Sequence, residues 1–224
     1  MTTAASRSEA SSGRFYAKLG SDGLADLASE EKTRADLRLA KRLCRGGQDV
    51  LDLACGYGRI AVPLALAGWN VRGIDLARPL IVAARRAARR AASPARFDVG
   101  SMLDLPYRAA SFDRVLCLWS SFNHLLTVAD QRACVAEMLR VLRPGGRAYI
   151  ESVDAGLPSI RRRLAREGFG DGKRLATWTL GGATITHFFH DRSTLTTACA
   201  DARHVRIGLT AVHGVRRLTA RLRA

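Results

Sequence analysis

The sequence lacks the closely spaced cysteine pairs of a disulfide framework or a zinc module. It has five cysteines, an odd number, and none of them forms a CxxC pair. At 224 residues the chain is long enough to build a core without crosslinks, because folding at this size buries about 70% of the surface that the unfolded chain exposes. We therefore expect reduced and mostly buried thiols in a folded domain.

Long hydrophobic runs are also missing. Residues 1–13 are small and polar, without the apolar region of a signal peptide. The longest apolar stretch, residues 60–69, is interrupted by Pro63 and is too short to span a bilayer. These absences predict a cytoplasmic protein without membrane contact, whose first 13 residues form a disordered tail.

Acidic side chains are scarce. The chain has 20 Asp and Glu against 36 Lys and Arg, a net charge of +16, and 32 of the basic residues are arginine. A charge of this size makes nucleic acid a partner to consider. The favoured interpretation is compositional, because Ala, Arg, Gly and Leu are abundant along the whole chain. Nucleic acid therefore stays the less favoured partner, and the sequence indicates no oligomeric state.

Helical and strand-like patterns alternate between residues 29 and 154. We expect strands at 50–54, 71–75, 95–99, 112–118 and 147–153, and helices at 29–44, 78–91 and 127–142, with an Ala/Leu-rich helix that Gly68 ends. This alternation is typical of a doubly wound parallel α/β sheet, which binds ligands beyond the carboxyl ends of its strands.

The remaining residues are less regular. The pattern favours a basic helix at 161–167, strands within 174–189 that are broken at Gly181 and Gly182, a helix at 193–202 and a final strand at 205–214. These segments are expected to form the acceptor side and the C-terminal strands of one domain.

A glycine loop and two acids lie at the ends of the first two expected strands. Residues 52–58 read D-x-A-x-G-x-G, and the two glycines permit a tight turn with no Cβ in the way of a ligand. The loop is not a dinucleotide fingerprint, because Ala61 replaces the third glycine and Asp52 would repel a pyrophosphate. An acid there suits an ammonium group. Asp75 ends the next strand, where a carboxylate accepts hydrogen bonds from ribose hydroxyls, or alternatively caps the following helix.

Five segments occur in a specific order and spacing: the glycine loop, G-I-D-L at 73–76, G-S-M-L-D-L-P-Y at 100–107, F-D-R-V-L at 112–116 and L-R-P-G-G at 142–146. In these segments the chain resembles the class I S-adenosylmethionine-dependent methyltransferases, in particular small members that act on low-molecular-weight acceptors. The resemblance covers about residues 29–154. It implies a Rossmann-like, seven-stranded, mostly parallel sheet with an antiparallel last strand and an N-terminal lid helix, in one domain spanning 14–224.

The resemblance implies a binding site for S-adenosylmethionine over the carboxyl ends of the strands. Asp52 and the backbone of residues 54–56 (Ala54, Cys55 and Gly56) would hold the methionyl group, and Asp75 the ribose. The Leu118 carbonyl and Trp119 would border the amino acid end.

The adenine contacts follow from the same resemblance. Leu76 and Met102 would enclose the base. Related sequences usually have an aspartate at the position of Ser101, where it accepts a hydrogen bond from the exocyclic amine of adenine. A serine hydroxyl accepts this bond more weakly.

The acceptor side offers two candidate catalytic residues. His124 lies in the aromatic and polar segment 118–125, where the methyl group would emerge, and is a candidate base or orienting group; packing on the next helix is the alternative. Phe15 and Tyr16 precede the first expected helix and would form a lid, with Tyr16 the second catalytic candidate. His187 and His190 have no further ligand cluster nearby, so no metal is expected.

These observations favour methyl transfer to nitrogen or oxygen of a small-molecule acceptor, in keeping with specialised metabolism. The arginines at 161–163 and 166 suggest an anionic acceptor bound under residues 15–16 and 154–190. One alternative is an RNA-directed methyltransferase that uses the arginines between residues 85 and 96. Against it, the chain has neither the Asn/Asp-Pro-Pro-aromatic signature nor a Pro-Cys pair. The other alternative is a cofactor-binding protein without catalysis.

Overall fold

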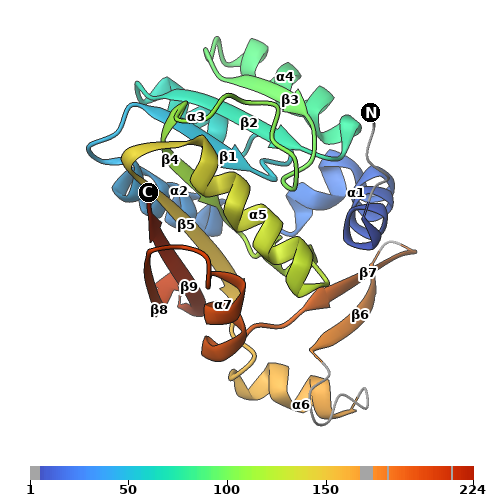
Figure 1. The fold of residues 1–224 in the computed structure, drawn as a ribbon. Helices are drawn as coiled ribbons and strands as arrows, with labels where there is room; N and C mark the ends of the chain where they lie inside the picture. Colours follow the sequence, from blue (N-terminus) through green and yellow to red (C-terminus); the bar gives the residue numbers. More distant parts are fainter. Residues whose placement is uncertain (1–5, 167–173, 181, 213) are drawn as a thin grey trace.

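A seven-stranded sheet forms the centre of the molecule in the computed structural model, which describes residues 6–166, 174–180, 182–212 and 214–224 (Figure 1). The strand order is β3-β2-β1-β4-β5-β9-β8, and the first five strands are mutually parallel. The last strand, β9, runs antiparallel to both of its neighbours. The predicted doubly wound sheet with an antiparallel last strand is confirmed. The strands are β1 (Asp49–Leu53), β2 (Asn70–Asp75), β3 (Arg96–Val99), β4 (Phe112–Cys117), β5 (Leu142–Val153), β8 (His204–Val212) and β9 (Val215–Arg223).

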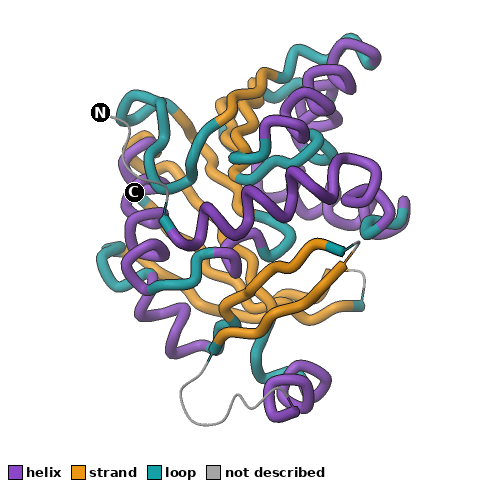
Figure 2. Tube along the Cα trace, turned by 90° about the vertical axis from the view of Figure 1, so that its right-hand side faces the viewer, coloured by secondary structure: helices purple, strands orange, loops and turns teal. Residues whose placement is uncertain are grey.

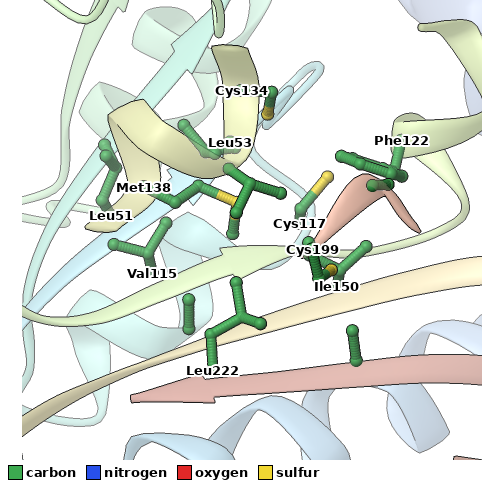
Figure 3. Close-up of a cluster of buried hydrophobic side chains, with 14 of the residues drawn as sticks. Leu51, Leu53, Val115, Cys117, Phe122, Cys134, Met138, Ile150, Cys199 and Leu222 are labelled. Atoms are coloured by element: carbon green, nitrogen blue, oxygen red, sulfur yellow. The ribbon is translucent and has the colours of Figure 1, made fainter. Parts of the chain in front are cut away.

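Helices cover both faces of this sheet. One apolar layer packs α2 (Glu30–Cys44), α3 (Ala61–Leu66) and α4 (Arg78–Arg90) on one face. The other layer packs α5 (Val128–Val141) and α7 (Arg192–Ala198) on the opposite face. Figure 3 shows this second layer, where Cys117, Cys134 and Cys199 lie among aliphatic side chains. All five cysteines are free and buried, as the sequence predicts.

Local capping explains where the regular helices begin. Ser29 accepts a hydrogen bond from the backbone N–H of Lys32 at the start of α2. Thr127 accepts one from Asp130 at the start of α5, in the T-x-x-D segment. In β4, Val115 to Cys117 are at most 1% exposed, as expected for a strand covered on both faces.

The N-terminal segment corrects the predicted tail. Helix α1 (Arg7–Asp26) begins within residues 1–13, so the part of that tail from residue 7 on is helical, while residues 1–5 lie outside the described residues. The helix starts with a capping box between Ser6 and Glu9 and is kinked at Gly20, where φ is 69°. Tyr16 precedes α2, the first expected helix, as predicted, and lies within the additional helix α1. The prediction of a disordered tail failed because small and polar residues give no helical pattern in the sequence. The helix is held by docking onto the rest of the chain.

The C-terminal third differs from the sequence prediction in its strands. The expected strand at 205–214 is β8, and a second strand, β9, follows it in a hairpin with Val212 paired to Val215. Strand β5 begins at Leu142, five residues earlier than expected, and α7 ends at Ala198. Helix α6 (Pro158–Arg166) begins three residues earlier than expected, and Glu167 lies outside the described residues. A separate two-stranded sheet pairs β6 (Leu175–Leu180) with β7 (Ala183–Phe188) (Figures 1 and 2). Gly181, at the expected break between these strands, lies outside the described residues.

Candidate functional site

A pocket lies at the carboxyl ends of β1, β2 and β4, and helix α1 forms part of its wall. Strand β1 is central, with β2 on one side and β4 on the other, so the chain reverses its direction of travel across the sheet here. Open α/β sheets bind ligands at such a switch point. The lining includes the predicted residues Tyr16, Asp52, Ala54, Cys55, Gly56, Asp75, Leu76, Met102, Leu118, Trp119 and His124. Tyr16 and His124, which are 108 positions apart in the sequence, are therefore brought together in one cavity.

The glycine loop is tied to the end of β2 by Asp75. Its carboxylate accepts hydrogen bonds from the backbone N–H of Gly56 and of Ala77, both at 2.9 Å. Ala54, Gly56 and Gly58 all have positive φ, which explains the glycines of the motif. Asp75 does not cap α4, whose N-cap residue is Ala77. An ionised carboxylate has about four acceptor positions, so Asp75 keeps capacity for a ligand.

Asp52 is a buried carboxylate in the pocket, with an exposed fraction of 4%. Burial raises the pKa of Asp52 to about 7; Arg59 opposes this shift and Asp75 adds to it. A buried acid of this kind gains most from a ligand that brings a positive charge. The site therefore suits an ammonium group next to Asp52.

A buried ion network supports the pocket wall on the other side of Asp52. Arg59 donates to Asp36 at 2.8 Å, and Arg217 bonds to Asp36 at 3.1 Å and to Glu151 at 2.5 Å. The Arg59 guanidinium also lies 4.9 Å from the ring centroid of Trp119. This network fixes Trp119, which has a positive φ of 56°. Sequence reasoning missed the network because its members come from three separate elements and the loop before α3.

Helix α1 supplies pocket residues that sequence reasoning also missed. Glu9, Ser12 and Gly13 line the cavity beside Leu76 and Met102. Ser101, predicted to contact the cofactor, is not part of this lining. Its hydroxyl donates to the Glu9 carboxylate and accepts from the backbone N–H of Leu103. The carboxylate that faces the cavity at this position therefore belongs to Glu9.

Tyr16 and His124 form a hydrogen-bonded pair in the pocket. The Tyr16 hydroxyl oxygen is 2.8 Å from Nε2 of His124. Burial lowers the pKa of His124 well below its usual range, and His187 adds to the shift. Burial, followed by the charge of Asp75, raises the pKa of Tyr16. Both groups are therefore neutral near pH 7, and the Tyr16 hydroxyl donates to Nε2 in the His124 tautomer that carries its ring proton on Nδ1.

The other expected acceptor groups are placed differently. The His187 ring lies near that of His124 in a tilted arrangement, with 4.5 Å between ring centroids, while His190 is fully buried against Phe122 and outside the pocket lining. Arg161 and Arg162 on α6 do not line the pocket either, while the side chains of the other two arginines offered for an anionic acceptor, Arg163 and Arg166, lie outside the description. Within the described ranges no group of three or more His, Cys, Asp or Glu is placed to hold a metal ion. No helix in those ranges has the length and hydropathy that a bilayer crossing requires.

Comparisons with known proteins agree on one family. Residues 50–146 match a family model described as a methyltransferase domain. Methyltransferase GfsG of Streptomyces halstedii is 35% identical over 132 residues, which are 57% of this chain and 46% of that protein. Demethylmenaquinone methyltransferase of Deinococcus radiodurans is 38% identical over 113 residues, 50% of this chain and 45% of that protein. The chain thus spans about half the length of these curated relatives.

The fold comparison covers more of the chain. The crystal structure of the CcbJ methyltransferase from Streptomyces caelestis superimposes with a TM-score of 0.70 over 96% of this chain and 98% of that one, at 18% identity. This likeness extends the shared fold beyond the matched core to α1 and the C-terminal strands.

Proposed function

We propose that the chain is a class I S-adenosylmethionine-dependent methyltransferase and that it transfers a methyl group from S-adenosylmethionine to oxygen or nitrogen of a small-molecule acceptor. The observation that carries the proposal is the single pocket in which Asp52 and Asp75 flank the glycine loop beside the apolar side chains of Leu76 and Met102. The names of the curated relatives, a demethylmenaquinone methyltransferase among them, support a small acceptor.

The residues present fit this cofactor. Asp52 and the backbone of residues 54–56 bind the ammonium end, next to Leu118 and Trp119. Asp75 accepts from the ribose hydroxyls, and Leu76 and Met102 enclose the base. When bound, the cofactor supplies an electrophilic methyl group on a sulfonium. Helix α1 closes the pocket as a lid and excludes water from the transfer.

Tyr16 and His124 then act on the acceptor. Methyl transfer from a sulfonium disperses charge, so positioning supplies much of the acceleration, and a base is needed only where the nucleophile must lose a proton. The Tyr16 hydroxyl oxygen accepts the proton of the nucleophile. At the same time the hydroxyl proton of Tyr16 passes to Nε2 of His124. The depressed pKa of His124 keeps the imidazole neutral in the free site, so a ring nitrogen has a lone pair for this proton.

The cytoplasm is the proposed location, because five free and buried cysteines fit a reducing compartment. The arginines of α4 do not line the pocket, and one of them, Arg85, donates to the carbonyl of Phe97. No feature of the site therefore favours the RNA-directed alternative.

Calorimetry tests cofactor binding directly. We expect S-adenosylmethionine and S-adenosylhomocysteine to bind with micromolar dissociation constants, and NAD to bind far more weakly because Asp52 would face its pyrophosphate. No binding of either sulfur compound, or tighter binding of NAD, would contradict the proposed function.

The affinity for S-adenosylhomocysteine is expected to rise with pH between about 5.5 and 7.5. Asp52 must be ionised to pair with the ligand's ammonium group, and its pKa is about 7. Below that value each pH unit should weaken binding by up to about tenfold, and above it the affinity should level off. Titration calorimetry across this range measures the effect. The Asp52→Asn variant should bind weakly at every pH, and a flat wild-type profile would show that Asp52 does not pair with the ligand.

A further inference from the structure

A narrow part of the pocket has apolar walls and a carboxylate at its edge. Gly13 of α1 lies directly over Leu76, where an added Cβ would come within 3.3 Å of the leucine side chain. Met102 and Gly100 line the same cavity. Glu9 precedes Gly13 by one helical turn, so both residues face the same way along α1. Gly13 packs against Leu76 and leaves no room for a ring between them, so a flat heteroaromatic ring would lie along the cavity side of Leu76, with Met102 and Gly100 beside it and Glu9 at its edge.

The Glu9 carboxylate is held in place from two sides. One oxygen accepts from the backbone N–H of Ser6 at 3.1 Å, as the third helical residue of a capping box does. The other oxygen accepts from the hydroxyl of Ser101, 92 residues away in the sequence. An ionised carboxylate offers about four acceptor positions and no donor, so Glu9 has room for a further donor only.

The start of α1 is anchored beside Glu9. The hydroxyl of Ser8 donates to Asp130 at 2.5 Å and accepts from the backbone N–H of Leu126 at 2.8 Å. Ser8 is 1% exposed. These contacts tie the first turn of α1 to the loop before α5 and to α5 itself, so the position of Glu9 relative to Leu76 and Met102 is defined.

We propose that Glu9 selects the base of the bound nucleoside by accepting a hydrogen bond from its exocyclic amine, and that Ser101 positions Glu9 for this role. The inference rests on the proposed function, because it assumes a nucleoside whose ribose lies at Asp75. A purine with an amine at this edge donates to the carboxylate. A purine with a carbonyl at this edge would place the carbonyl oxygen, a hydrogen-bond acceptor, against the Glu9 carboxylate, which is also an acceptor. A site built to bind a donor rejects such an analogue.

The test compares S-adenosylhomocysteine with S-inosylhomocysteine, in which a carbonyl replaces the exocyclic amine. Wild-type protein should bind the adenosine compound at least about 30-fold more tightly. The Glu9→Gln variant should bind it about 10- to 100-fold more weakly than wild type does, because a charged acceptor is lost. Its preference should also shrink to within about threefold, since the amide can donate to the carbonyl.

Two further variants make the result specific. Glutamine is accepted at the same capping-box position, so α1 should persist in Glu9→Gln. Glu30→Gln makes the same chemical change on α2, where the carboxylate side chain is 88% exposed, and should leave both affinities unchanged. Ser101→Ala leaves both capping residues in place and removes the hydroxyl that orients Glu9, so it should lower the preference by at least about threefold.

The outcomes separate the two proposals. If wild-type protein binds neither compound, the proposed function fails. If it binds S-adenosylhomocysteine but shows no preference over the inosine compound, or if Glu9→Gln keeps the full preference, the inference about Glu9 is overturned while the function stands. Should Glu9→Gln fail to fold, an unchanged preference in Ser101→Ala would overturn it in the same way.

Discussion

Replacing His124 by alanine is expected to lower kcat by about 10²- to 10⁴-fold, with little change in affinity for S-adenosylhomocysteine. In the proposed mechanism the imidazole accepts the proton of the nucleophile by way of Tyr16, whose hydroxyl lies 2.8 Å from Nε2. Tyr16→Phe removes only that hydroxyl and should show a loss of similar size. The measurement is turnover of an acceptor identified by screening metabolites with labelled S-adenosylmethionine.

The pH profile distinguishes this role from packing. Because burial holds the pKa of His124 well below its usual range, the neutral form persists to low pH. At saturating cofactor, where the protonation of Asp52 does not limit binding, kcat of the wild type should therefore show no fall near pH 6.5 and should decline only as the pH approaches the depressed pKa of His124. His204→Ala, on the exposed face of β8, is the matched control and should keep full activity. If His124→Ala turns over at the wild-type rate at every pH, His124 is structural and proximity alone drives transfer.

Replacing Asp75 by alanine is expected to weaken S-adenosylhomocysteine binding by about 1.5 to 3 kcal/mol, or roughly 10- to 150-fold. The variant loses the acceptor for the ribose hydroxyls. It also loses the bonds that hold Gly56 and Ala77, so the glycine loop is no longer tied to β2. Calorimetry at a single pH measures the change.

Two further variants serve as controls for the Asp75→Ala result. Asp75→Asn keeps one side-chain oxygen for the loop and should recover part of the loss. Asp201→Ala removes a carboxylate that is 63% exposed and paired with Arg132, and it should bind like wild type. Native affinity in Asp75→Ala would show that the carboxylate does not contact the ligand.

Features that depend on neighbouring residues could be predicted from the sequence. The T-x-x-D segment predicted the start of α5, and Ser29 marks the start of α2. The alternation of helix and strand patterns predicted the parallel sheet and the edge at which Asp52 and Asp75 lie. Such signals are local, because a cap or an amphipathic pattern is decided within a few residues.

Strand β9 shows why other features could not be predicted. Its sequence carries four arginines, and one of them, Arg217, points into the protein with 6% of its side chain exposed. That burial is tolerated because Asp36 of α2 and Glu151 of β5 surround the guanidinium. Neither acid is near Arg217 in the sequence, so the burial of this arginine could not be predicted, although Leu218, Ala220 and Leu222 alternate as the buried face of a strand does.

The sequence by itself determined the sheet and the acids that flank the glycine loop, because both follow from local patterns and from the order of the strands. Only the tertiary structure decided that α1 docks on the pocket, that Tyr16 meets His124 and that Glu9 lines the pocket while bonded to Ser101. Tyr16 and His124 are 108 positions apart in the sequence, and Glu9 and Ser101 are 92 positions apart. They depend on how whole elements pack against each other, and local patterning specifies which side of an element is buried without specifying its partner.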